Sequence, residues 1–220
     1  MAQNIKSVAF FNILLKNYLY QVYYSKRNVT SVSVQEKIMK KIIVIYESKY
    51  GSTKRYAQWI AQDLSCKVFP RKAIHPDDLK DFDTIIYGGG LYAGGVSGIS
   101  LLTKYFEQIK EKNIVLFTCG LADPQDPDNI AHIRKSLEKV LTPEMLQAFH
   151  LFHFRGGIDY SGLNFVHKAM MGMLHHSMLK KDYNTLREED KLMLDTYGKK
   201  VDFTDKDSIE PLVGFIKNLC

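Results

Sequence analysis

Short apolar runs alternate along this chain with segments of helical periodicity, and this alternation is what most limits the possible folds. Five runs read as strands and four longer segments as helices; the strands are residues 42–46, 66–69, 84–87, 114–118 and 149–154, and the helices are residues 52–64, 101–109, 128–141 and 205–219. Strands that alternate with helices at this spacing indicate βαβ units and a parallel sheet. We therefore predict an α/β fold, with a doubly wound five-stranded parallel sheet in the order 2-1-3-4-5 and helices on both faces.

Glycine-rich turns follow four of the five expected strands. They contain Gly51, Gly88–Gly90, Gly120 and Gly156–Gly157, after strands one, three, four and five respectively. The carboxyl ends of parallel strands lie at one edge of a sheet, and ligands of such sheets bind outside that edge. We expect a ligand site there.

Residues 1–38 differ in character from the rest of the chain. Residues 1–40 hold six basic side chains and one acidic side chain, and so account for +5 of the net charge of +6. The body is then almost neutral, and the chain is not expected to bind nucleic acid. Met39 precedes two lysines and an apolar strand, as at many bacterial N-termini, so our hypothesis is that translation starts there. The alternative is that residues 1–38 form a membrane-surface or targeting arm. We expect this extension to be poorly ordered and to carry no chemistry, with one functional domain at 39–220.

Cysteine usage and hydropathy bear on the cellular compartment. Cys66, Cys119 and Cys220 lie far apart, with no CxxC pair. A disulfide scaffold or a thiolate metal site is therefore not expected, and a cytoplasmic location is favoured. No stretch approaches the eighteen or so apolar residues that a membrane-spanning helix needs.

The turn after the first strand is rich in hydroxyl groups. Ser48, Ser52 and Thr53 surround Gly51 at the start of the first expected helix. Main-chain N–H groups and the positive end of the helix dipole favour an anion at this position, and the hydroxyls suit a terminal monophosphate. The turn matches neither a Walker loop nor GxGxxG. Capping of the helix by Ser or Thr explains the same residues equally well.

Two further loops could surround a flat ligand. Five glycines occur in the eight residues Gly88–Gly95, around Tyr92, which offers an aromatic face for stacking. The loop Thr118–Asp123 follows the fourth strand and has no aromatic residue. Cys119 is interpreted as a small apolar filler rather than as a nucleophile. No arrangement of side chains identifies a catalytic residue.

The hydroxyl-rich turn resembles the flavodoxin signature, in which Thr or Ser, any residue, Thr, Gly, any residue and Thr follow the first strand. Tyr50 stands where that signature has its first invariant Thr. The resemblance implies a flavodoxin-like fold and FMN as cofactor, with the 5′-phosphate in this turn and the isoalloxazine ring beside Tyr92. The cofactor-binding residues expected from it are Ser48, Lys49, Tyr50, Gly51, Ser52, Thr53, Gly89, Gly90, Leu91, Tyr92, Thr118, Cys119, Gly120 and Asp123.

A long helical insertion, residues 158–200, follows the fifth strand. It holds an expected helix, Leu163–Leu179, with four of the eight methionines of the chain. Three interpretations stay open. The segment 163–181 can make a peripheral contact with the inner face of the membrane, it can cover a large apolar substrate, or it can be an additional core helix.

The run Phe154–Leu163, with the methionine-rich helix after it, resembles the flavodoxin-type, menaquinone-dependent protoporphyrinogen IX dehydrogenases. This resemblance implies an FMN-dependent oxidoreductase that takes electrons from protoporphyrinogen IX or a similar bulky donor and passes them to a quinone. The alternative is a flavodoxin-type electron carrier that serves redox-partner proteins. A receiver-type regulator would need an acidic pocket after strands one and three, which Glu47 alone does not provide.

Overall fold

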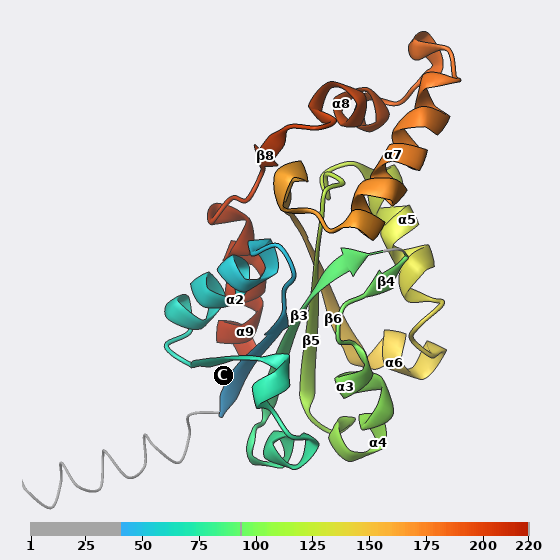
Figure 1. Cartoon of the computed structure of the whole chain (residues 1–220). Coiled ribbons are helices and arrows are strands. Elements are labelled where there is room, and N and C mark those ends of the chain that lie inside the picture. Colours follow the sequence, from blue (N-terminus) through green and yellow to red (C-terminus); the bar gives the residue numbers. More distant parts are fainter. Residues whose placement is uncertain (1–40, 93, 220) are drawn as a thin grey trace, which may run out of the picture. The chain divides into compact units, whose positions relative to one another are not determined.

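The computed structural model describes residues 41–92 and 94–219, and the expectations for residues 1–38 lie outside this range. Five parallel strands form the sheet in the order β2-β1-β3-β5-β6 (Figure 1). Their bounds are β1 Ile42–Glu47, β2 Lys67–Pro70, β3 Thr84–Tyr92, β5 Asn113–Gly120 and β6 Phe149–Arg155. The flavodoxin-like parallel sheet predicted from the sequence is confirmed.

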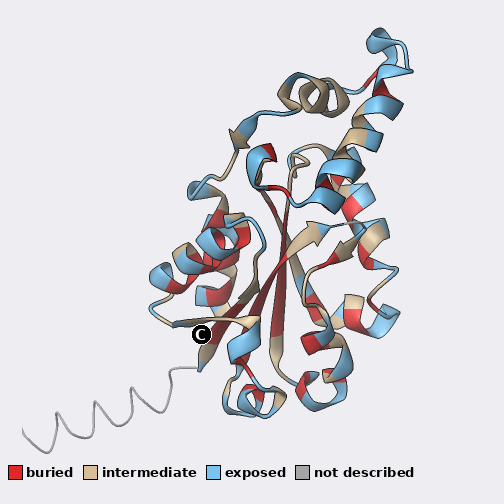
Figure 2. Ribbon diagram, in the orientation of Figure 1, coloured by how far each residue is buried: buried red, intermediate tan, exposed pale blue. Residues whose placement is uncertain are grey.

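Helices cover both faces of the sheet. Successive side chains of a strand point to opposite faces, and the central strands are apolar throughout, so both faces have to be buried. Ile43 and Ile45 of β1 belong to one core cluster and Val44 to the other. The helices are α2 Ser52–Asp63, α3 Ser100–Lys104, α4 Phe106–Ile109, α5 Pro127–Leu137, α6 Pro143–Ala148 and α9 Glu210–Leu219. The first cluster includes residues of α3, α4, α5 and α6, and the second includes residues of α2 and α9. Figure 2 shows the buried residues concentrated along the central strands.

The third strand is longer than the sequence predicted. It was expected to end before the three glycines at 88–90, whereas β3 continues through them to Tyr92 and pairs with β4, Gly95–Val96. Packing explains two of these glycines. A Cβ at Gly88 would lie 2.0 Å from Cζ of Phe117, and one at Gly89 would lie 2.2 Å from Cγ1 of Val96. Both positions exclude a side chain because their neighbours fill the space.

Two helical segments also differ from the prediction. The helix expected at 101–109 is interrupted at Tyr105, whose φ of −113° and ψ of 17° separate α3 from α4. The helix α6 was not predicted, although its start carries a recognisable signal. Thr142 accepts a hydrogen bond from the main-chain N–H of Met145 at 3.2 Å, and Pro143 takes the first helical position.

The insertion after β6 is largely helical, as predicted, but it also contains two strands that were not predicted. Its ends pair as a two-stranded antiparallel ladder, β7 Gly157–Asp159 with β8 Lys200–Asp202. Between them lie α7, Phe165–Leu179, and α8, Glu188–Thr196. Figure 1 shows α7 beyond the carboxyl ends of the strands, at the edge where the glycine-rich turns meet.

Candidate functional site

A cavity of about 660 Å³ opens at the carboxyl ends of the parallel strands. The four glycine-rich turns singled out in the sequence and the inner side of α7 form its walls. Ten predicted residues line it: Ser48, Lys49, Tyr50, Ser52, Thr53, Gly90, Leu91, Tyr92, Cys119 and Gly120. The other four, Gly51, Gly89, Thr118 and Asp123, are not part of the lining. The sequence therefore predicted much of the cavity wall on the side of the sheet.

The first helix of the domain begins at this cavity without a side-chain cap. Gly51 occupies the N-cap position with φ 99° and ψ −29°, and no side-chain hydrogen bond caps α2 within the described structure. The hydroxyl of Ser48 instead accepts a hydrogen bond from the N–H of Gly51 at 3.1 Å. The alternative that Ser or Thr caps this helix is therefore not what the structure shows. An uncapped N-terminus of a twelve-residue helix favours an anion.

Thr53 and Cys119 form the floor beside this helix start. Thr53 is 4% exposed and Cys119 is 6% exposed. Burial raises the pKa of the Cys119 thiol to about 12, with a smaller opposing effect from its hydrogen bond with Thr53. The thiol is therefore protonated at neutral pH, as the interpretation of Cys119 as a filler requires.

The turn after β6 closes the cavity from the side, although Gly156 and Gly157 were not among the predicted cofactor-binding residues. The N–H of Gly157 donates to the hydroxyl oxygen of Ser52 at 3.2 Å. A Cβ at Gly156 would lie 2.9 Å from Sγ of Cys119. The sequence placed this glycine-rich turn at the ligand edge of the sheet, but only the fold shows that its main chain approaches the turn after β1.

His167 on α7 is the main site residue that the sequence analysis missed. It is 4% exposed, and its ring centroid lies 4.0 Å from that of Tyr92. Its Nε2 is 3.0 Å from Nζ of Lys49, and its Nδ1 contacts the hydroxyl of Tyr50. The Tyr92 hydroxyl also donates to Sδ of Met170 at 3.4 Å. These contacts join α7 to both predicted ligand loops, and they give Tyr50, the departure from the flavodoxin signature, a structural partner.

The partners of His167 define its protonation state. An ammonium group only donates, so Nε2 accepts from Lys49, and Nδ1 carries the proton toward Tyr50. Burial and, second, the nearby charge of Lys49 lower the pKa of His167. Burial also raises the pKa of Tyr50. The contact is thus one between a neutral imidazole, a neutral phenol and a cation.

Asp123 lies in the loop that follows β5 and forms an ion pair with Arg155 of β6. Its carboxylate pairs with Nη1 of Arg155 at 3.0 Å, and Nε of Arg155 donates to the carbonyl of Leu121 at 3.1 Å. The guanidinium also lies 4.2 Å from the centroid of the Phe203 ring. Arg155 therefore fixes the course of the loop that follows β5.

Thr118 likewise lies outside the cavity lining. Its Oγ1 is 2.7 Å from Nδ1 of His153 on the neighbouring strand β6. Burial, with a smaller effect from Arg134, lowers the pKa of His153 to about 4. His153 is therefore neutral at physiological pH and links the ends of the two strands.

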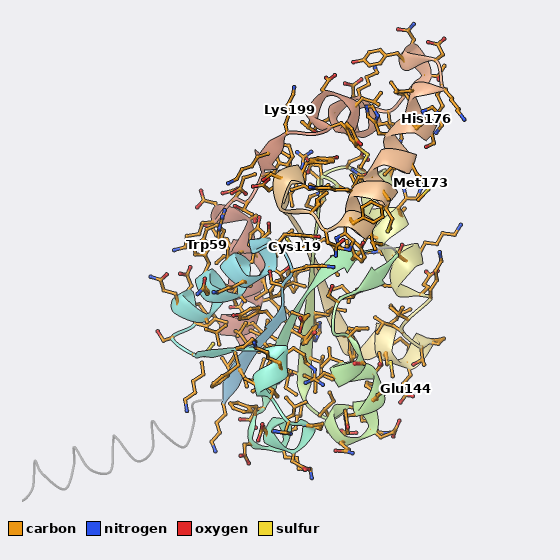
Figure 3. All side chains as sticks on the ribbon, in the orientation of Figure 1. Trp59, Cys119, Glu144, Met173, His176 and Lys199 are labelled. Carbon is orange, nitrogen blue, oxygen red and sulfur yellow. The ribbon has the colours of Figure 1, made fainter. Side chains whose placement is uncertain are left out.

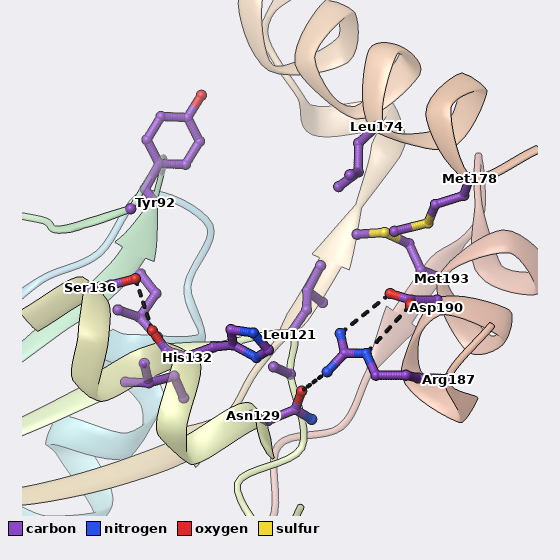
Figure 4. Close-up of a pocket in the computed structure, with 14 residues that line it drawn as sticks. Tyr92, Leu121, Asn129, His132, Ser136, Leu174, Met178, Arg187, Asp190 and Met193 are labelled. Carbon is purple, nitrogen blue, oxygen red and sulfur yellow. Dashed lines mark hydrogen bonds and ion pairs between the residues drawn. The ribbon is translucent and has the colours of Figure 1, made fainter. Parts of the chain in front are cut away.

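A second cavity, of about 400 Å³, adjoins the first (Figure 4). Both are lined by Leu91, Tyr92, Leu121, Ala122 and Leu174, and the second extends between α5 and the insertion. Its polar end is built on Arg187, which donates to Asp190 and to the side-chain oxygen of Asn129, each at 3.4 Å (Figure 4). The rest of the wall is largely apolar, with Ile133, Met178 and Met193.

Two other kinds of feature, a cluster of metal-binding side chains and a membrane-spanning helix, are absent from the described residues. Within residues 41–92 and 94–219, no group of three or more His, Cys, Asp or Glu side chains is placed to hold a metal ion. In the same part of the chain, no helix has the length and hydropathy needed to span a membrane.

Comparisons with known proteins agree with this architecture. Residues 43–185 match the family described as Flavodoxin domain. No curated protein matches the chain. Among solved structures, the flavodoxin WrbA-like protein from Agrobacterium tumefaciens is 22% identical, with a TM-score of 0.38 over 51% of this chain and 76% of that one. A flavoprotein in complex with FMN from Lactobacillus acidophilus is 13% identical, with a TM-score of 0.35 over 53% of this chain and 93% of that one. The two-electron reduced flavodoxin of Megasphaera elsdenii is 16% identical, with a TM-score of 0.32 over 43% of this chain and 77% of that one. Because the family match spans more than half of the 220 residues, the chain belongs to the flavodoxin domain family.

Proposed function

We propose that this protein is an FMN-dependent oxidoreductase with a bulky organic substrate of its own. The observation that carries the proposal is the uncapped N-terminus of α2, which opens onto a cavity of about 660 Å³. Main-chain N–H groups at the helix start and the hydroxyls of Ser48 and Ser52 bind the phosphate of FMN. The bound flavin supplies the redox chemistry, and the protein contributes binding, orientation and local charge.

The remaining walls of the cavity suit the flavin ring. Leu91, Leu121 and Met171 are apolar, and Tyr92 offers a partly exposed aromatic face. The ammonium of Lys49, 5.3 Å from the centroid of the Tyr92 ring, adds a positive charge. A fixed cation of this kind stabilises the additional negative charge of a reduced bound group.

The second cavity supports a substrate of the protein's own. It shares five residues of its wall with the flavin cavity, so a molecule bound there lies next to the flavin. Its mostly apolar wall fits a bulky apolar donor, and we propose protoporphyrinogen IX or a similar compound, with a quinone as acceptor. This choice of substrates follows the resemblance of the run from Phe154 to Leu163 and the helix after it.

The alternative is a flavodoxin-type electron carrier that passes electrons between redox-partner proteins. Tyr50 and Tyr92 are 39% and 37% exposed at the rim of the cavity, and a partner protein can reach them there. This surface is the observation that favours the alternative. The two proposals then differ in one respect: the second cavity binds a substrate in the enzyme and has no such role in the carrier.

Two measurements test these proposals in sequence. The purified protein is expected to be yellow and to release FMN on denaturation; colourless protein that does not bind added FMN contradicts both. The FMN-loaded protein is then mixed anaerobically with protoporphyrinogen IX or with a menaquinol. Reduction of the flavin by the donor and reoxidation by a menaquinone over many turnovers supports the enzyme. Met178→Trp, at a residue that lines the second cavity and not the first, should slow that turnover without releasing FMN. If FMN binds and neither compound exchanges electrons with it, the carrier is favoured.

A further inference from the structure

Exposed apolar side chains are concentrated on one segment of this molecule. Eight large hydrophobic residues are exposed in the described part of the chain. Six of them lie between residues 165 and 183: Phe165, Val166, Met173, Leu174, Leu179 and Tyr183. The other two are Tyr50 and Tyr92, and like them Leu174 lines the flavin cavity. Figure 3 places Met173 and His176 on α7.

The helix α7 is apolar on both of its sides. On the side that faces the domain, His167 and Met178 are buried, and Met170 and Met171 line the flavin cavity. On the opposite side, Phe165 is 86% exposed and Met173 is 67% exposed. These two residues are eight positions apart, about two helical turns, so they share a face. Three exposed polar residues, Lys168, His176 and Ser177, lie among these apolar side chains on the solvent side of α7.

Positive charge flanks the exposed apolar face. Lys168, Lys180 and Lys181 are all exposed, and within the described residues the structure shows no ion pair at any of them. The adjacent acid, Asp182, accepts a hydrogen bond from the N–H of Asn184 at 3.0 Å and caps the short helix that follows. Apolar side chains between lysines are typical of helices that lie in a membrane interface, with the lysines at anionic headgroups.

We propose that α7 docks on an anionic lipid surface through its outer face. Phe165, Val166 and Met173 enter the boundary between headgroups and acyl chains, while Lys180 and Lys181 stay at the headgroups. The charge complementarity of these lysines selects a membrane over a second copy of this chain, which would bring the same cations together. Because the opposite side of α7 lines the flavin cavity, docking would place that cavity beside the lipid. The proposal does not depend on flavin binding.

Vesicle co-sedimentation of the full-length, FMN-loaded protein tests this proposal. Binding is compared on vesicles of phosphatidylcholine alone and on vesicles with one third phosphatidylglycerol, and the protein is measured on gels so that flavin content does not enter. We expect clear binding to the anionic vesicles only. Reversing Lys180 and Lys181 together to Glu should weaken it at least about 30-fold, since each basic residue near such a surface contributes about 1 kcal/mol. Changing Phe165 and Met173 together to Ser should weaken it at least about 100-fold, because two large apolar side chains no longer leave water.

Matched variants keep the result specific. Lys139→Glu with Lys217→Glu makes the same change in net charge at exposed positions outside the insertion, and Phe165→Leu with Met173→Leu keeps the apolar area. Both should bind vesicles like the parent protein. Equal losses from both pairs of lysines, or no binding of the parent protein, would overturn the proposal. A dimer of the parent protein in sedimentation velocity that is lost in the variant with Phe165→Ser and Met173→Ser would also overturn the proposal. The outer face would then be an interface between two copies of this chain.

Discussion

The exchange of Ser52 for Asp tests the phosphate site most directly. Ser52 is the first residue of α2, lines the cavity, and accepts a hydrogen bond from the N–H of Gly157 through its hydroxyl. A carboxylate keeps an acceptor for that bond, and negative charge at a helix start stabilises the helix by roughly 0.3–1 kcal/mol. The protein should therefore stay folded. Its one new property is a negative charge where the phosphate of FMN is proposed to bind.

The expected loss of affinity follows from Coulomb's law. Two unit charges about 4 Å apart interact by about 4 kcal/mol at an effective dielectric constant of 20, and every 1.4 kcal/mol is a factor of ten. Repulsion of one phosphate charge thus weakens FMN binding about 1,000-fold, and a dianion is weakened further. Ser52→Asn is the matched control, because Asn has nearly the same shape as Asp without its charge.

The assay is a titration of apoprotein, followed by the quenching of flavin fluorescence. FMN is compared with riboflavin, which has the same ring and no phosphate. We expect Ser52→Asp to lose FMN affinity and to keep the riboflavin affinity of Ser52→Asn, with similar melting temperatures for the two variants. Equal FMN affinity of the two variants would refute the phosphate site. An equal loss of riboflavin and FMN would refute the assignment of this turn to the phosphate.

Three further predictions concern residues that support the cavity without lining it: His153, Gly88 and Arg155. His153 has a folded-state pKa of about 4, below the 6.5 of an unfolded chain, so the unfolded state binds the proton first as the pH falls. Between pH 6.5 and 4 the free energy of unfolding should drop by about 3 kcal/mol through this group, and chemical denaturation of His153→Asn should lack that part of the pH dependence. Gly88→Ala should lower the free energy of unfolding by about 1–3 kcal/mol or more, because its Cβ meets the Phe117 ring; a variant that melts like the parent would contradict this packing. Arg155→Lys loses the forked contact with Asp123 and the carbonyl of Leu121, so FMN affinity should fall about fivefold to tenfold, while unchanged affinity would show that the loop keeps its course without Arg155.

Local patterns were sufficient to predict the fold class and many of the residues that line one wall of the cavity. Continuous apolar, β-branched runs such as Ile42–Tyr46 mark strands that are buried on both faces. Apolar residues that recur about every 3.6 positions mark helices, because this repeat follows from helix geometry. Parallel strands place their carboxyl ends at one edge, so the turn around Gly51 and the loop at Tyr92 were expected to meet. The first is the uncapped start of α2, and both line one cavity.

Packing between distant segments decided the rest. Gly88 and Gly89 belong to β3 instead of forming a loop. These positions are glycine because Phe117 and Val96 fill the space that side chains would need. The contact of His167 with Lys49 spans 118 positions, and no local repeat records such a pair. The sequence by itself determined the five parallel strands and most of the helices between them, since these depend on patterns among neighbouring residues. Only the tertiary structure decided that α7 covers the cavity with one side and exposes Phe165 on the other, because that choice depends on surfaces that come together after the chain has folded.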